Sequence, residues 1–172
     1  DKPRAWSGVL IVVSCCLSAA CGGAVDQPAS PVVLQGPYLG QDPPGTSPRL
    51  FAPGVVSTGM LERDVAMTPG GDELYFTRVL AGYTFSAILG TRQVDGTWTA
   101  PEVASFSGRY FDLEPHISPD GARFYFVSRR PMPGDEGPTD NENIWVMERV
   151  ADGWGDPEPL PSTINTEAGE FF

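Results

Sequence analysis

Apolar and polar positions alternate in two short stretches of the chain, and the alternation returns after about 50 residues. Leu74–Thr77 and Phe124–Val127 are aromatic, alternating runs of the kind that form packed β-strands. Each follows a turn sequence, Thr68–Gly71 or Ser118–Gly121, in which Pro and Gly occupy positions that suit a tight turn. The pattern predicts two strand–turn–strand hairpins.

These hairpins belong to a longer repeat. Residues 64–77 align with 114–127 without a gap, and residues 88–102 align with 144–158. Third strands are therefore predicted at 86–92 and 143–149. Because 20 glycines and 18 prolines interrupt any helical period, we predict an all-β fold with four short strands in each unit.

A period near 50 residues with strand content indicates the blades of a β-propeller. The predicted fold is a partial β-propeller over residues 49–172, with four-stranded blades at about 60–105 and 110–161. A third blade is expected to begin at about 165, where Glu170 takes the place of Asp112. Residues 51–57 resemble 99–105, the last strand of a blade, and indicate a remnant before the first unit.

A closed propeller needs about four to eight blades, so we expect the two blades to be part of a longer protein. The alternative is that several copies of the two-blade chain close a ring.

The first residues have the pattern of an export signal. Lys2 and Arg4 precede an apolar, uncharged run that ends in small residues at Ala20, which predicts a signal peptide over residues 1–20. Cys21 then stands where a lipid-anchored cysteine would follow cleavage, and residues 21–48, rich in Pro, Gly, Ser and Gln, are predicted to be the anchor and a flexible linker. Cys15 offers a second match with a shorter apolar core, and an ordinary secretory signal with an incidental Cys21 is the other alternative.

The repeat motifs carry a family resemblance. The Ser118–Gly121 turn, the Tyr-Phe strand after it, the strand at Ile144–Val146 and the Gly-Trp close at Trp154 resemble the tandem repeats of TolB-like periplasmic proteins, relatives of WD-type propellers. The resemblance covers roughly residues 38–172, and residues 38–45 resemble the entry segment of lipoproteins that carry such repeats. The first unit departs from the pattern at Val65 and Gly70. The resemblance implies a periplasmic or outer-membrane location and partners among envelope proteins.

Charge and cysteine content exclude some functions. The net charge of −11 makes nucleic acid an unfavourable partner, because phosphate binding requires basic patches. All three cysteines lie at positions 15, 16 and 21, so no disulfide framework or thiolate metal site is expected in the repeats. No cofactor and no metal site are predicted.

Acidic residues recur just before the first strand of each unit. They are Glu62 and Asp64, then Asp112 and Glu114, with His116 next to the second pair. Because the first strand of a blade lines the central channel, these residues define a possible channel-mouth site for a ligand, a hard cation or a basic partner. The alternative is that they bind backbone N–H groups at blade junctions or face water.

Other candidate chemistry has a structural alternative in each case. His116 is the one histidine, and without a nucleophile elbow it is expected to be a hydrogen-bonding residue. The acidic loop 131–143 lacks the pattern of a calcium loop and is expected to be solvated. Trp98 and Trp154 could stack on a sugar, but their shared repeat position favours blade packing.

The predicted function is non-catalytic: a binding or scaffold propeller of a bacterial cell-envelope lipoprotein, held at the membrane by Cys21 and binding envelope proteins or a small ligand. The alternative is the propeller portion of a secreted hydrolase, either carbohydrate-active or a serine peptidase, whose catalytic residues lie outside this chain. No catalytic residue is predicted here.

Overall fold

The computed structural model describes residues 34–80 and 82–171. The predicted signal peptide and Cys21 lie outside these residues. In the part of the chain that is described, no helix is both long enough and apolar enough to cross a membrane.

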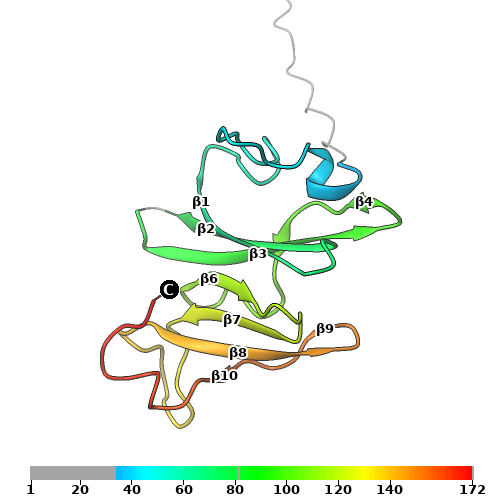
Figure 1. Ribbon diagram of the computed structural model, residues 1–172. Coiled ribbons are helices and arrows are strands. Elements are labelled where there is room, and N and C mark those ends of the chain that lie inside the picture. Colours follow the sequence, from blue (N-terminus) through cyan, green and yellow to red (C-terminus); the bar gives the residue numbers. More distant parts are fainter. Residues whose placement is uncertain (1–33, 81, 172) are drawn as a thin grey trace, which may run out of the picture. The chain divides into compact units, whose positions relative to one another are not determined.

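The described chain forms two antiparallel sheets that lie against each other (Figure 1). Blade 1 is built from strands β1 (Leu61–Met67), β2 (Glu73–Leu80), β3 (Phe85–Val94) and β5 (Glu102–Val103), with β4 (Thr97–Trp98) as a short hairpin partner of β3. Blade 2 repeats this order with β6 (Asp112–Ile117), β7 (Arg123–Ser128), β8 (Asn143–Val150) and β10 (Glu158–Pro159), and β9 (Gly153–Trp154) pairs with β8. The predicted all-β, partial-propeller fold with two four-stranded blades is confirmed.

The two predicted hairpins and both third strands form as expected. β1 pairs with β2 and β6 with β7, each pair joined by the predicted turn. In both turns the final glycine, Gly71 or Gly121, has a φ near +70°, a conformation that costs glycine little. The outermost strands, β5 and β10, are only two residues long.

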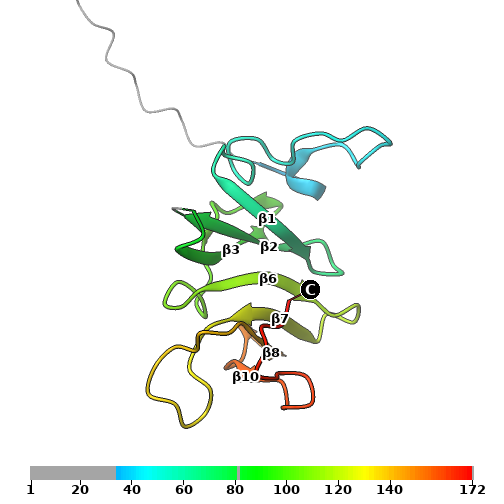
Figure 2. The same cartoon turned by 90° about the vertical axis from the view of Figure 1, so that its left-hand side faces the viewer.

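Alternation along the strands sends side chains to the two faces of each blade. In blade 1, Leu74, Phe76 and Leu89 face one way and pack with Ala52 and Val56. The opposite face of blade 1 meets blade 2, and Ala66 and Ile88 join a second buried cluster there. The members that blade 2 contributes are Ile117, Phe124, Phe126, Trp145 and Met147. Figure 2 shows β1 and β6 side by side at this junction, in agreement with their contacts.

The segment before blade 1, here called the entry segment (residues 34–57), covers the other face of that blade. It contains a short 3-10 helix, η1 (Pro37–Gly40), and Leu39 is fully buried. The indole N–H of Trp98 donates to the Gly36 carbonyl at 2.8 Å. Residues 34–48, expected to be linker, therefore include part of the folded body, because the apolar face of blade 1 and the Trp98 indole both need a partner.

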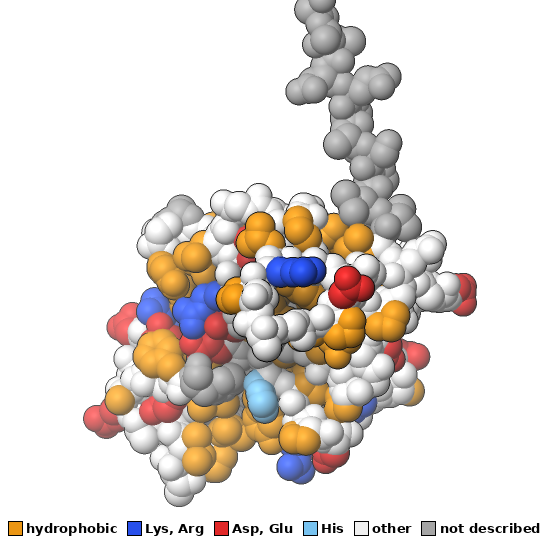
Figure 3. Space-filling model, turned by 45° about the horizontal axis from the view of Figure 1, so that its top comes forward, with side chains coloured by type: hydrophobic (Ala, Val, Ile, Leu, Met, Phe, Trp, Pro, Cys, Tyr) orange, Lys and Arg blue, Asp and Glu red, His pale blue; other side chains and the backbone are white. Residues whose placement is uncertain are grey.

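Residues 51–57, expected to be a strand remnant, form turns and join neither sheet. They still cover one face of blade 1. The equivalent face of blade 2 is covered by blade 1 itself. Figure 3 shows the side of the molecule near the entry segment, where apolar side chains lie among charged ones.

Candidate functional site

The predicted acidic positions lie at equivalent irregularities in the two inner strands. The register of β1 against β2 shifts between Arg63 and Ala66, and that of β6 against β7 shifts between Leu113 and His116. Asp64 and Glu114 occupy these two bulges, with φ of 55° and 57°. A non-glycine residue with such a φ is uncommon, so both blades share a special backbone conformation at the carboxylate.

Arg63 brings these two carboxylates together. Its Nε lies 2.5 Å from Asp64 Oδ2, and its terminal nitrogen lies 2.8 Å from Glu114 Oε1. Burial lowers the pKa of Arg63, but the contacts with Asp64, Tyr83 and Glu114 together outweigh burial and the pKa is raised. The Glu114 N–H also donates to Thr77 Oγ1 at 3.1 Å, so this cluster ties the inner strands of the two blades together.

The other predicted positions lie in separate contacts. Asp112 is fully buried and accepts hydrogen bonds from Ser107, Ser128 and Arg130. Glu62 pairs with Arg78 at 3.5 Å.

His116 is exposed on β6, near the Tyr125 ring. Glu170 accepts hydrogen bonds from the backbone and hydroxyl of Thr166.

Of the acidic residues predicted for a channel mouth, the structure thus brings Asp64 and Glu114 to one place. Sequence reasoning missed Arg63, which neutralises part of their charge. Among the described residues, no group of three or more His, Cys, Asp or Glu side chains is placed to hold a metal ion. A ring of carboxylates would require further blades, and it stays a prediction.

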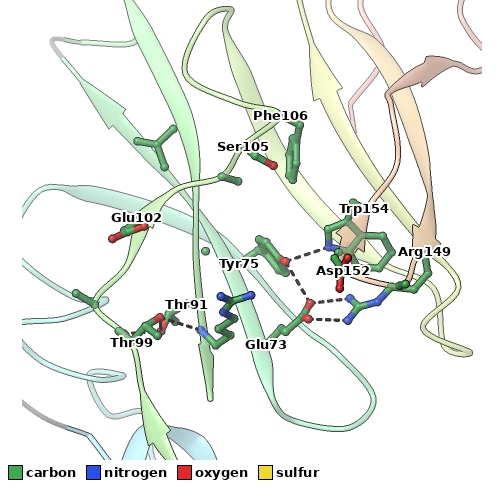
Figure 4. Close-up of a pocket in the computed structure, with 17 residues that line it drawn as sticks. Glu73, Tyr75, Thr91, Thr99, Glu102, Ser105, Phe106, Arg149, Asp152 and Trp154 are labelled. Atoms are coloured by element: carbon green, nitrogen blue, oxygen red, sulfur yellow. Dashed lines mark hydrogen bonds and ion pairs between the residues drawn. The ribbon is translucent and has the colours of Figure 1, made fainter. Parts of the chain in front are cut away.

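A second candidate site is a groove between the two blades, with a volume of about 660 Å³. Blade 1 contributes residues of β2 and β3 and the segment 99–106, and blade 2 contributes residues of the β8–β9 hairpin. Figure 4 shows Thr99 and Glu102 on one side, Asp152 and Trp154 on the other, and Tyr75 between them. We call this site the inter-blade groove.

Two contacts across the blades fix the floor of the groove. Both terminal nitrogens of Arg149 bind Glu73, at 2.7 and 2.6 Å, a bidentate arrangement that favours one geometry. The Trp154 indole N–H donates to the Tyr75 hydroxyl at 3.0 Å, and that hydroxyl donates to Glu73 at 3.2 Å. The groove therefore has a rigid, hydrogen-bonded base.

Burial, and then the nearby Glu73 carboxylate, raise the pKa of Tyr75 to about 12. The phenol consequently keeps its proton at neutral pH. Gly90 sets the position of the ring, because a Cβ there would lie 2.8 Å from Tyr75, closer than packed carbon atoms approach. A glycine within β3 is thus explained by the aromatic ring that packs over it.

Several polar groups of the groove have no partner among the residues that the structure describes. They are the side chains of Arg92, Glu102, Ser105 and Asp152, and all four residues are exposed.

Arg92 lacks a partner because one cross-strand charge pair differs between the two repeats. Glu73 stands opposite Arg92 in blade 1, and Arg123 stands opposite Glu148 in blade 2. The blade 2 pair closes at 3.0 Å, whereas Glu73 binds Arg149 of blade 2 instead. Arg92 is left with a free guanidinium that lines the groove.

Sequence reasoning named Trp154 but not the groove. The charges of this cross-strand pair are reversed between the repeats, from Glu73–Arg92 to Arg123–Glu148. That reversal was a signal of the groove in the sequence, since a repeat otherwise keeps the chemistry of equivalent positions.

In the acidic loop 131–143, Glu142 pairs with Arg129 at 2.5 Å. A smaller cavity of about 260 Å³ lies between the entry segment and blade 1, next to Trp98.

Comparison of the chain with protein-family models, with curated proteins and with solved structures found no match.

Proposed function

We propose that this chain belongs to a non-catalytic binding protein of the bacterial cell envelope, and that the inter-blade groove is its recognition site. The observation that carries the proposal is the set of unpaired polar side chains, Arg92, Glu102, Ser105 and Asp152, above a rigid floor. Exposed groups held around a concave site of this volume are available to a ligand without first breaking internal bonds.

Binding fits the floor of the groove better than catalysis does. Glu73 is engaged by Arg149 and Tyr75, and the raised pKa of Tyr75 makes the phenol a poor proton donor to a reaction at neutral pH. His116 lies on β6 and is not part of the groove lining. The polar groups of the floor therefore hold the blades together, and the groups of the rim are left to recognise a partner.

The envelope location rests on the N-terminal sequence and on the resemblance to TolB-like repeats. A basic start, an apolar run and Ala20-Cys21 favour export and acylation at Cys21. One acyl chain gives only marginal anchoring, so stable attachment would use more than one.

Location is tested by labelling bacteria that express the chain with a radioactive fatty acid. We expect label on the wild type and on Cys15→Ser, and loss of label on Cys21→Ser. Equal label on the Cys21→Ser variant would contradict the lipid anchor at this residue.

Recognition is tested by blocking the groove. Ser105→Trp places a large ring on the exposed rim, and Ser162→Trp, also at an exposed serine but outside the groove, is the matched control. Thermal-shift measurements with a panel of sugars, peptides and calcium should give at least one ligand that stabilises the wild type and the control but not Ser105→Trp. If every ligand that stabilises the wild type stabilises Ser105→Trp equally, the groove is not the site.

A further inference from the structure

We propose that the inter-blade groove binds a neutral, hydroxyl-rich ligand, namely a segment of an uncharged oligosaccharide. This inference rests on the proposed function and names the ligand class of the same site.

The charges of the groove oppose a strongly charged ligand. Its ionisable side chains include two arginines, Arg92 and Arg149, and three carboxylates, Glu73, Glu102 and Asp152. Charges of both signs line the groove and leave a small net negative charge. A polyanion would meet three carboxylates, and a polycation would meet two guanidinium groups, so neither gains the one-sign field that charged ligands use.

The unpaired groups suit hydroxyl groups instead. An ionised carboxylate accepts hydrogen bonds at two oxygens, and a guanidinium donates from several N–H groups held in one plane. Each hydroxyl on a sugar ring is both a donor and an acceptor, so it can bond to either kind of group. Arg92 of blade 1 thus supplies donors, and Glu102 of blade 1 and Asp152 of blade 2 supply acceptors from the two sides of the groove.

Aromatic side chains supply the apolar part that a sugar ring also needs. Tyr75, Phe106 and Trp154 all line the groove and are half-buried. Phe124 packs edge-on against all three, with ring centroids 4.9 to 5.2 Å apart. The rings are therefore held in place before a ligand arrives, and their exposed parts can contact the C–H groups of a sugar ring.

A peptide is the less favoured ligand because the edge of β3 is closed, and β5, which closes part of it, is only two residues long. Extended peptides commonly add to a free strand edge. Here the edge of β3 is taken, since Leu89 and Gly90 pair with β5 and Gln93 and Val94 pair with β4. Between them, the Arg92 carbonyl accepts a hydrogen bond from the Thr99 N–H at 2.9 Å.

The test is titration calorimetry of the full chain with soluble hexasaccharides of glucose in α-1,4, β-1,4 and β-1,3 linkage and of N-acetylglucosamine. Polygalacturonate serves as an acidic polysaccharide comparator. Two unstructured peptides, one acidic and one basic, serve as peptide comparators. We expect at least one neutral hexasaccharide to bind and the comparators not to bind.

Two variants with repeat-matched controls locate the binding. Glu102→Gln and Asp152→Asn should each weaken binding about tenfold, the effect of losing one charge-assisted hydrogen bond. Glu158→Gln changes the counterpart of Glu102 in blade 2, and Asp95→Asn changes the hairpin-turn aspartate of blade 1. Both controls lie outside the groove and should bind as the wild type does.

The inference is overturned if no neutral hexasaccharide binds, or if one binds equally to wild type, Glu102→Gln and Asp152→Asn. Binding of a charged or peptide comparator that Ser105→Trp abolishes would also overturn it, while leaving the proposed recognition site intact. Absence of any groove-dependent binding would end both proposals.

Discussion

Blade 1 is covered by the entry segment, whereas the equivalent face of blade 2 is covered by another blade. Leu74 and Phe76 of blade 1 pack under residues of the entry segment, and their counterparts Phe124 and Phe126 pack against blade 1. An irregular segment and a regular sheet therefore cover equivalent apolar faces of the two blades.

The residues that cross these two junctions differ in charge, and the difference matches the groups that they bind. Gln93 and Trp98 of blade 1 both donate to the Gly36 carbonyl, at 2.8 Å each. Their counterparts Arg149 and Trp154 bind Glu73 and Tyr75 of blade 1. The same repeat position carries a neutral amide where it meets a backbone carbonyl and a guanidinium where it meets a carboxylate.

The largest difference between the blades should appear at the pair of acidic residues that begin them. Asp112 is fully buried with Arg130, and its counterpart Glu62 pairs loosely with Arg78. Asp112→Ala leaves a buried guanidinium without its carboxylate, which should lower the free energy of unfolding by about 3–5 kcal/mol. Glu62→Ala should cost less than Asp112→Ala, because the contact of Glu62 with Arg78 is longer and both side chains keep some exposure.

Urea denaturation of the two variants measures both values. Equal losses would show that the two blade starts are equally important and would contradict the comparison.

Trp98→Phe should have the next largest effect. The change removes the hydrogen bond to Gly36 and leaves space in a side-chain position that is 5% exposed, at a cost of about 1–3 kcal/mol. Hydrogen exchange of the Gly36 amide, which donates to Gly96, should become faster. Trp154→Phe is the counterpart control and should leave that exchange rate unchanged.

Tyr75→Phe tests the blade-to-blade junction through its pH dependence. The folded pKa of about 12 exceeds the ordinary tyrosine value of about 10. The folded state therefore keeps a proton that the unfolded chain loses, and stability present below pH 10 should fall as the pH rises toward 12. At neutral pH the variant should lose about 1 kcal/mol with its hydrogen bonds.

Urea midpoints at pH 7, 10 and 12 check this expectation. Between pH 10 and 12 the wild type should lose more stability than Tyr75→Phe. Parallel curves would mean that Tyr75 does not cause the fall.

The smallest effects should come from the turns. Ser118 donates to Asp120 in blade 2, and Asp120 also accepts from the Ala122 N–H; these contacts lower the pKa of Asp120. In blade 1 the equivalent position is Gly70, and Thr68 donates instead to Asp72, at 2.6 Å. Asp72→Ala should shift the urea midpoint slightly downward, and adding Gly70→Asp should recover the shift. Failure of recovery would show that the two turns are not equivalent.

The sequence predicted the repeated parts of the fold because each copy serves as a check on the other. The hairpins at 64–77 and 114–127 and both third strands are confirmed. The blade 1 turn departs from the pattern at Gly70, yet it keeps the hydroxyl–carboxylate contact by moving the acid two residues along the chain.

Features that depend on contacts between copies could not be read from one copy. From the sequence, Glu73 could pair with Arg92 or with Arg149. It pairs with Arg149 because the two blades pack against each other. Residues 34–50 of the entry segment have no counterpart in the repeat, so nothing in their composition predicted that Leu39 would be buried. Whether Asp64 and Glu114 also bind a cation or a basic partner in a larger ring stays a prediction.

The bulges at Asp64 and Glu114 have a consequence for behaviour in concentrated solution. β1 and β6 are the end strands of their sheets, and a regular end strand offers a row of unpaired backbone groups to any neighbouring molecule. A left-handed residue carrying a carboxylate interrupts that row at the same point in both blades. The conformation that positions the acidic groups should therefore also hinder strand-to-strand aggregation between molecules.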